Sequence, residues 1–127
     1  MAEQSKIGTV GWIDLTVPDA TAIRDFYQKV VGWKHAPVSM GEYDDFCMIP
    51  QNSEDPVSGI CYAKGANKDL PPSWIIYIVV ENLEASLKDV KTLGGEMLSE
   101  VKKIPGQGQY CIIKDPAGAV SALYQQE

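Results

Sequence analysis

The feature that most constrains the fold of this chain is a sequence pattern that occurs twice. Residues 12–17 (WIDLTV) are echoed by residues 74–79 (WIIYIV), at an offset of 62. The correspondence continues at offsets between 60 and 64, in the pairs Asp19 and Glu81, Gly32 and Gly94, FCMI (46–49) and YCII (110–113), and Asp-Pro at 55–56 and 115–116. Repetition at this period indicates two copies of one structural unit.

Each copy reads as a strand, a helix and three further strands. In the first copy, the strand over residues 12–17 is followed by Asp19, whose side chain can cap a helix from near Ala20 to about Val31. Gly32 can supply the left-handed end of that helix. The apolar stripe expected to face the sheet is Ile23, Phe26, Tyr27, Val30 and Val31.

In the second copy, Asn82 or Glu81 opens the equivalent helix, which Gly94 and Gly95 stop. Its matching apolar stripe is Leu83, Leu87, Val90 and Leu93. Residues 115–118 (DPAG) have Asp, Pro and Gly at the positions that a β-turn favours. This turn predicts a closing hairpin near the C-terminus.

Both copies are expected in a single domain covering residues 1–127. A chain of 127 residues with 45% hydrophobic content can bury one good core. Residues 64–72, rich in Gly, Asn, Asp and Pro, are the expected connection between the copies. A sheet covered by one helix leaves its other face open, which favours association of the two halves. The prediction is an α+β fold with module one at about 7–64 and module two at about 73–126.

Charge and composition restrict the partners. The net charge is −6, and the basic residues include only one short pair, Lys102 and Lys103, so we expect no nucleic-acid partner. The longest apolar run, residues 74–80, is strand-sized, so no membrane helix is expected. The polar start MAEQSKIG does not resemble a secretion signal, which favours a cytoplasmic location.

The cysteines are odd in number and widely spaced. Cys47, Cys61 and Cys111 form no CxxC pair. This is typical of reduced, buried thiols, with metal ligation as the alternative.

The segments WIDLTVPDATAIRDFYQKVVGW and KDPAGAVSALY resemble the first strand and helix and the final hairpin of the vicinal oxygen chelate superfamily, which includes glyoxalases, bleomycin resistance proteins and extradiol dioxygenases. The resemblance implies two tandem βαβββ modules, whose paired curved mixed sheets surround a central concavity with a helix outside each. The motifs WIIY before VEN (residues 74–82) and GQYC before DPAG (residues 108–118) resemble the branch related to lactoylglutathione lyase. Homodimers are common in this superfamily, so a homodimer is expected.

The resemblance also locates the positions that bind metal in metal-using members. In those members a His or Gln lies seven residues before the Asp or Asn that opens the helix, and a Glu lies seven residues after the Asp of the Asp-Pro turn. Here these positions are Trp12, Trp74 and Ala122, with the first-half equivalent of Ala122 within residues 60–62. Because hard metals need converging imidazole or carboxylate donors, we expect no metal site and no cofactor.

A pocket without metal is therefore the predicted site. Alternation along the strands places Trp12, Asp14 and Thr16 on the face away from the helix. The full expected set of ligand-binding residues is Trp12, Asp14, Thr16, Trp74, Ile76, Tyr110, Ala122 and Tyr124. Ile78 and Val120 share those faces by the same rule. Such an apolar, aromatic lining is typical of small-molecule pockets, although the two indoles could instead fill the cavity.

Asp14 is the candidate catalytic residue, if there is one, because an inward-facing carboxylate needs a partner or a purpose. The alternative places it, solvated or paired, at the pocket rim. His35, the only histidine, is interpreted as a surface loop residue, with a catalytic base as the alternative. Asp44, Asp45, Glu54 and Asp55 are interpreted as solvated loop acids.

Three functions remain open at this point. The preferred one is metal-free binding of a small apolar or aromatic molecule. A glyoxalase-like lyase or related small-molecule enzyme is the second. A packed domain with no small-molecule site is the third.

Overall fold

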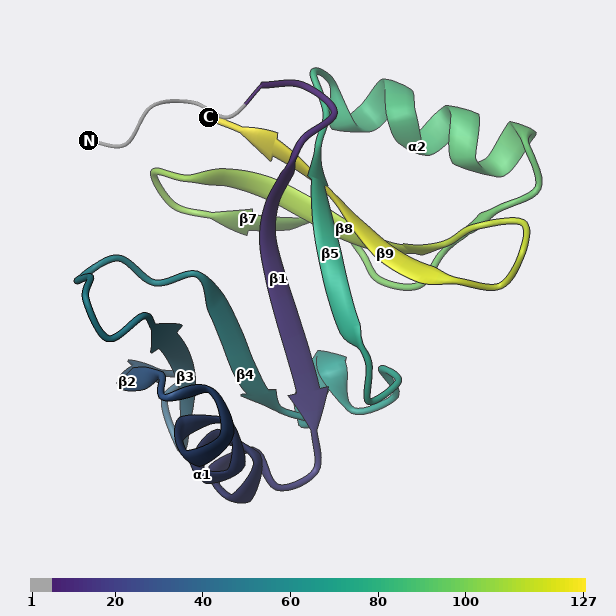
Figure 1. Cartoon of the computed structure of the whole chain (residues 1–127). Coiled ribbons are helices and arrows are strands. Elements are labelled where there is room, and N and C mark those ends of the chain that lie inside the picture. The colour runs from purple at the N-terminus through teal and green to yellow at the C-terminus, as the bar shows by residue number, and fades with distance from the viewer. Residues whose placement is uncertain (1–5) are drawn as a thin grey trace. The chain divides into compact units, whose positions relative to one another are not determined.

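The computed structural model describes residues 6–127, which form two compact units. One comprises residues 13–74, and the other comprises residues 75–127 together with residues 6–12 (Figure 1). The elements are β1 Val10–Val17, α1 Ala20–Val31, β2 Lys34–Ser39, β3 Asp44–Ile49, β4 Ser58–Tyr62, the 3-10 turn η1 Gly65–Asn67, β5 Trp74–Val79, α2 Leu83–Thr92, β6 Glu96–Met97, β7 Lys102–Ile104, β8 Gly108–Lys114 and β9 Val120–Gln126. The predicted α+β class is confirmed.

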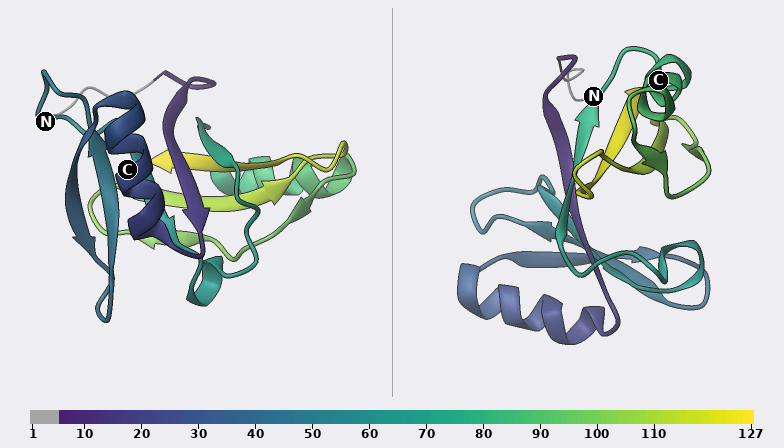
Figure 2. Two further views of the ribbon diagram at one scale, coloured as in Figure 1. Left: turned by 60° about the horizontal axis from the view of Figure 1, so that its bottom comes forward. Right: turned by 90° about the vertical axis from the view of Figure 1, so that its right-hand side faces the viewer.

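In residues 13–74 the strand order is β2-β3-β4-β1. β1 runs parallel to β4, and β2, β3 and β4 are antiparallel neighbours. The parallel pair requires a crossover connection, and α1 is part of it. The helix lies against one face of this sheet (Figures 1 and 2).

Local signals set the ends of α1 as expected. The side chain of Asp19 accepts a hydrogen bond from the Ala22 amide at 3.1 Å. Gly32 has φ of 86°, a conformation that avoids strain only without a Cβ, and its amide donates to the Gln28 carbonyl. The predicted bounds of this helix are confirmed.

The apolar stripe of α1 is narrower than predicted. Ile23 and Tyr27 pack against the core cluster of Leu15, Val17, Ala20, Phe46, Met48 and Ile60. Phe26, Val30 and Val31 are more than half exposed in residues 6–127. The helix contacts the sheet along the line that Ala20, Ile23 and Tyr27 define, and the other three side chains lie on its flanks.

In residues 75–127 the strand order is β5-β9-β8-β6, with β7 also paired to β8. β5 is parallel to β9, and β9 and β8 are antiparallel. Residues 6–12 belong to this unit: the Gly8 amide donates to the Val79 carbonyl at 2.7 Å. The parallel, then antiparallel, order matches that of residues 13–74.

The outer strand of this unit is interrupted. β6 and β7 pair with the same edge of β8, but the register shifts by two residues between Met97↔Ile113 and Lys102↔Tyr110. Within the interruption, the Ser99 hydroxyl accepts a hydrogen bond from the Ile112 amide at 3.0 Å. The sequence predicted one strand here, and the structure divides it in two.

Two side chains cap the start of α2. Asn82 accepts from the Ala85 amide at 3.0 Å, and Gln125 of β9 accepts from the Leu83 amide at 2.7 Å. Asn82, rather than Glu81, is therefore the capping residue. Leu83 and Leu87 are buried as predicted, but Leu93 is 73% exposed because the helix ends at Thr92.

The closing hairpin is confirmed. The Gly118 amide donates to the Asp115 carbonyl at 2.9 Å, and the Asp115 side chain accepts from the amides of Ala117 and Ala119. Neither helix within residues 6–127 is long and apolar enough to cross a membrane.

Candidate functional site

The strand register of residues 13–74 defines a polar surface on the sheet. Thr16 is paired with Cys61, and both Asp14 and Cys47 are paired with Gly59, so alternation puts them on one face. Asp45 shares that face, two residues before Cys47. We call Asp14, Thr16, Asp45, Cys47 and Cys61 the acid–thiol face. Leu15 and Val17 point the other way, into the core against α1, as predicted.

Asp45 is the functional candidate that sequence reasoning missed. It was interpreted as a solvated loop acid, but it lies in β3 and is only 6% exposed. Its carboxylate accepts a hydrogen bond from the Tyr62 amide at 2.9 Å. Burial raises the pKa of Asp45, opposed by the hydrogen bonds from the Tyr62 amide and the Cys61 thiol. The available signal was alternation in DDFCMI, which places Asp45 with Cys47.

Cys61 is a protonated thiol in this arrangement. Burial raises the pKa of Cys61 far above its ordinary value, and the nearby carboxylates of Asp14 and Asp45 raise it further. The thiol therefore donates to Asp45 rather than acting as a thiolate nucleophile. The three cysteines are free, and Cys111 is the fully buried one, while Cys47 and Cys61 are half-buried.

The raised pKa of Asp45 predicts a pH dependence of stability. The folded state holds the proton more tightly than the unfolded chain, so the contribution of this carboxyl is full below its unfolded pKa, about 3.9. It is lost as pH rises through the folded pKa. Asp45→Asn cannot ionise, so its stability relative to the natural protein should increase from pH 3.5 to pH 7 in urea unfolding.

Asp45→Ala is the matched variant. It lacks the ionisable group too, so its stability relative to the natural protein should follow the same pH trend as that of Asp45→Asn. It also leaves the Tyr62 amide without its acceptor, which should lower its stability below that of Asp45→Asn by about 1–3 kcal/mol. If the difference in free energy of unfolding between Asp45→Asn and the natural protein stayed constant from pH 3.5 to pH 7, the assigned pKa shift would be contradicted.

The register of residues 75–127 defines an aromatic surface. Tyr77 is paired with Ala122, and Tyr110 with Tyr124, so these four residues share one face, which we call the tyrosine face. The ring centroids of Tyr77 and Tyr110 are 5.4 Å apart. The Nζ atom of Lys102 lies 6.0 Å from the Tyr110 ring, within cation–π range.

The hydroxyl of Tyr124 has a defined role on this face. It donates a hydrogen bond to the Gln107 carbonyl. Burial raises the pKa of Tyr124, with a further increase from Glu127, so the hydroxyl stays protonated near neutral pH. Tyr110, Ala122 and Tyr124 therefore lie together, as alternation along the last strands predicted.

The predicted face of β5 is wrong by one residue. Ile78 packs against the core cluster that contains Leu83 and Leu87 of α2, as does Val80, whereas Ile78 was expected to face away from the helix. Alternation puts Ile76, which is 38% exposed, on the same side as Ile78. Tyr77 occupies the face to which Ile76 was assigned.

The error arose from the choice of cap. Matching Asp19 to Glu81 made Trp74 the equivalent of Trp12. Because Asn82 is the observed cap, the equivalent residue is Ile75, at an offset of 63.

Trp74 belongs to an aromatic cluster in residues 13–74. Its indole N–H donates to the Tyr27 hydroxyl at 3.2 Å, and its ring packs edge-on against Tyr27 and Trp33. These contacts hold the Trp74 ring in a fixed position, and the ligand-stacking role predicted for it stays a prediction. Trp12 is half-buried at the start of β1.

The residues at the family's metal positions do not fit a metal. Ile60 and Tyr62 point into the core beside α1, so Cys61 is the one of residues 60–62 that lies on the acid–thiol face. Its thiol is protonated, and Ala122 is fully buried. Across residues 6–127 there is no group of three His, Cys, Asp or Glu side chains placed to hold an ion.

His35 was expected in a surface loop, and that expectation is wrong. It lies in β2, with its ring edge-on to Phe46 at 5.7 Å. Burial lowers the pKa of His35, and the Arg24 guanidinium lowers it further, so the ring is neutral near pH 7. It lies on the helix side of the sheet with Phe46, away from Asp14 and Asp45.

Comparison with known proteins gives a family match and distant structural relatives. A model described as Glyoxalase/Bleomycin resistance protein/Dioxygenase superfamily matches residues 9–122. CFP32 of Mycobacterium bovis, provisionally named a glyoxylase, is 31% identical over 122 residues, covering 93% of this chain and 46% of that protein. The anthracycline biosynthesis protein DnrV of Streptomyces peucetius is 29% identical over 130 residues, covering 94% of this chain and 47% of that protein. The chain thus spans about half the length of these relatives.

Solved structures share the fold at low identity. Methylmalonyl-CoA epimerase from Mycobacterium tuberculosis has a TM-score of 0.61 and 13% identity, with 100% of this chain and 93% of that chain covered. A methylmalonyl-CoA epimerase in complex with methylmalonyl-CoA and NH4+ has a TM-score of 0.61 and 15% identity, with 95% of this chain and 96% of that chain covered.

Proposed function

Because the chain belongs to the Glyoxalase/Bleomycin resistance protein/Dioxygenase superfamily, we propose that it binds a small apolar or aromatic molecule without a metal ion. The ligand contacts the tyrosine face, where the half-buried rings of Tyr77 and Tyr110 provide stacking surfaces. Lys102, beside the Tyr110 ring, favours a ligand with a polar or anionic edge.

The observation that carries this proposal is the grouping of aromatic rings on one face. Tyr77, Tyr110 and Tyr124 come from three neighbouring strands, and the first two are in ring contact at 5.4 Å. Aromatic side chains are half-buried here rather than enclosed in the core. Rigid aromatic rings that carry hydroxyl groups are suited to stacking and to a few oriented hydrogen bonds.

Replacing Tyr110 tests the proposal. With 1-naphthol as the probe, we expect amide chemical shifts to change at Tyr77, Tyr110 and Ala122 in NMR spectra of metal-free protein. Tyr110→Leu should weaken binding about two- to tenfold, because aromatic contacts contribute about 0.5–1.5 kcal/mol beyond area burial. Tyr110→Phe retains the ring and should bind like the natural protein. Equal affinity of all three proteins would contradict the tyrosine face as the site.

A lyase-type activity is the second candidate function. It is favoured by the provisional name of CFP32 and by the carboxyl and thiol groups gathered on the acid–thiol face, with Asp14 as the candidate base. Elemental analysis of protein purified without tag or chelator, followed by thermal unfolding with Ni, Zn, Mn and Fe, distinguishes metal-free ligand binding from a metal-dependent lyase activity. About one metal ion per chain would favour metal-dependent chemistry. No metal and no ligand shift would favour the packed domain without a site.

We further propose a homodimer and a cytoplasmic location. The curated relatives are about twice as long as this chain, and a second copy would supply comparable length. Sedimentation equilibrium should give twice the chain mass of 13.9 kDa.

A further inference from the structure

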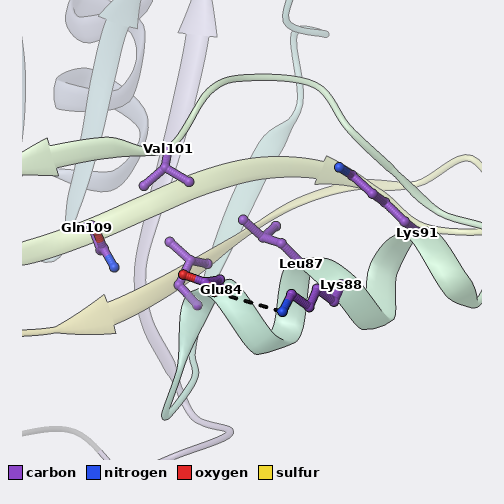
Figure 3. Close-up of a pocket in the computed structure, with 7 residues that line it drawn as sticks. Glu84, Leu87, Lys88, Lys91, Val101 and Gln109 are labelled. Atoms are coloured by element: carbon purple, nitrogen blue, oxygen red, sulfur yellow. Dashed lines mark ion pairs between the residues drawn. The ribbon is translucent and has the colours of Figure 1, made fainter.

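The helix side of the sheet in residues 75–127 has a groove that the proposed function does not use. It lies between α2 and the strands and has a volume of about 420 Å³. Small-molecule sites commonly have volumes of roughly 300–1,000 Å³, so one small ligand fits. Figure 3 shows the side chains that line it: Leu83, Glu84, Leu87, Lys88, Lys91, Val101 and Gln109.

The floor of the groove is apolar. Leu83 and Leu87 of α2 are fixed in the core, and Leu87 points from the helix into the groove (Figure 3). Val101, in the interruption between β6 and β7, remains 40% exposed at the mouth. An apolar ligand segment lying between Leu87 and Val101 would remove exposed hydrocarbon from water.

The rim carries positive charge that is only partly neutralised. The Nζ atom of Lys88 is 3.9 Å from Glu84, in a pair whose side chains are 78% and 85% exposed, so this interaction is weak. Lys91, in the last turn of α2, also borders the groove, and within residues 6–127 it forms no ion pair with a carboxylate. The amide of Gln109 adds a hydrogen-bonding group at the other end of the groove (Figure 3).

We propose that this groove binds a small amphipathic anion of the medium-chain carboxylate type. The carboxylate pairs with Lys91 and Lys88, and the hydrocarbon chain lies on Leu87 and Val101. A cationic or neutral polar ligand does not match this combination. In a chain of net charge −6, two lysines beside an apolar floor form a local site for an anion.

Octanoate is the probe. Acetate is the matched ligand that lacks the hydrocarbon tail, and octanol is the matched ligand that lacks the charge. Amide chemical shifts should change with octanoate at Leu87, Lys91, Val101 and Gln109, and affinity should rise from butanoate to hexanoate to octanoate. Each fully buried methylene would strengthen binding up to about fourfold. Salt at 0.5 M should weaken octanoate binding and leave octanol unaffected.

Charge variants test the head-group contact. Lys91→Met should weaken octanoate about two- to fivefold, the effect of one exposed charge pair. Glu84→Gln removes a like charge and frees Lys88, so it should strengthen binding. Lys29→Met is the matched control, because Lys29 and Lys91 are both exposed lysines in the last turn of a helix.

Three results would overturn the proposal. One is equal binding of octanol and octanoate, which would indicate an apolar patch only. Another is a loss of octanoate affinity in Lys29→Met equal to that in Lys91→Met. The last is a set of octanoate-induced shifts on the tyrosine face instead of the groove.

Discussion

Replacing Leu83 by alanine should lower the free energy of unfolding by about 2–5 kcal/mol, measured by urea denaturation. Leu83 is fully buried and packs with Leu87, Cys111, Ile113 and Leu123 between α2 and the sheet. Removing three carbon atoms there loses their transfer free energy and leaves a cavity that the helix and strands fill only partly.

Leu93→Ala is the matched control at the other end of α2. Leu93 is 73% exposed and follows the last helical residue, so its truncation should change stability by less than about 0.5 kcal/mol. Equal losses in the two variants would mean that the packing of α2 is wrongly described.

Ala122→Glu should destabilise the chain by about 3–6 kcal/mol at pH 7.5, from overpacking and from burial of a charge. Ala122 is fully buried in β9, paired with Tyr77 and Ile112. The substitution places at this position the carboxylate that metal-using relatives have. Because the described residues hold no metal-binding group, Zn²⁺ should not restore the lost stability.

The pH dependence separates charge from size. Burial should raise the pKa of the introduced carboxyl above its unfolded value of about 4.3. Stability is then highest below that value and falls as pH rises through the folded pKa. Ala122→Gln has nearly the same shape without the charge, so its stability relative to the natural protein should not vary between pH 5 and 7.5. Rescue of Ala122→Glu by Zn²⁺ would show that metal donors had been overlooked.

Features governed by local chemistry could be predicted from the sequence. Asp19, Gly32 and residues 115–118 act through hydrogen bonds and backbone conformations within a few residues. Their helix cap, helix end and hairpin turn were therefore predicted correctly.

Features governed by packing could not be predicted in the same way. Periodicity places Phe26 and Val30 near the apolar side of α1, but only the path of the helix over the sheet decides which side chains are covered. The face of β5 depended on whether Glu81 or Asn82 capped α2. Because side chains alternate along a strand, that one-residue ambiguity exchanged Ile76 for Tyr77 on the tyrosine face.

The acid–thiol face depended on pairing between distant strands. Asp45 lies beside another acid, Asp44, in a segment that resembles a loop in composition. Its burial follows from the pairing of β3 with β2 and β4, which the sequence does not specify locally.

The interruption between β6 and β7 affects how this unit meets other chains. Exposed edge strands present rows of unpaired amides and carbonyls that can recruit a strand from another molecule. Here the outer strand is split into pieces of two and three residues, with a register shift between them. In residues 13–74, the terminal strand β2 contains Pro37, which lacks an amide donor. Neither edge offers a long continuous template, which protects the chain against open-ended strand addition and favours association through side-chain surfaces.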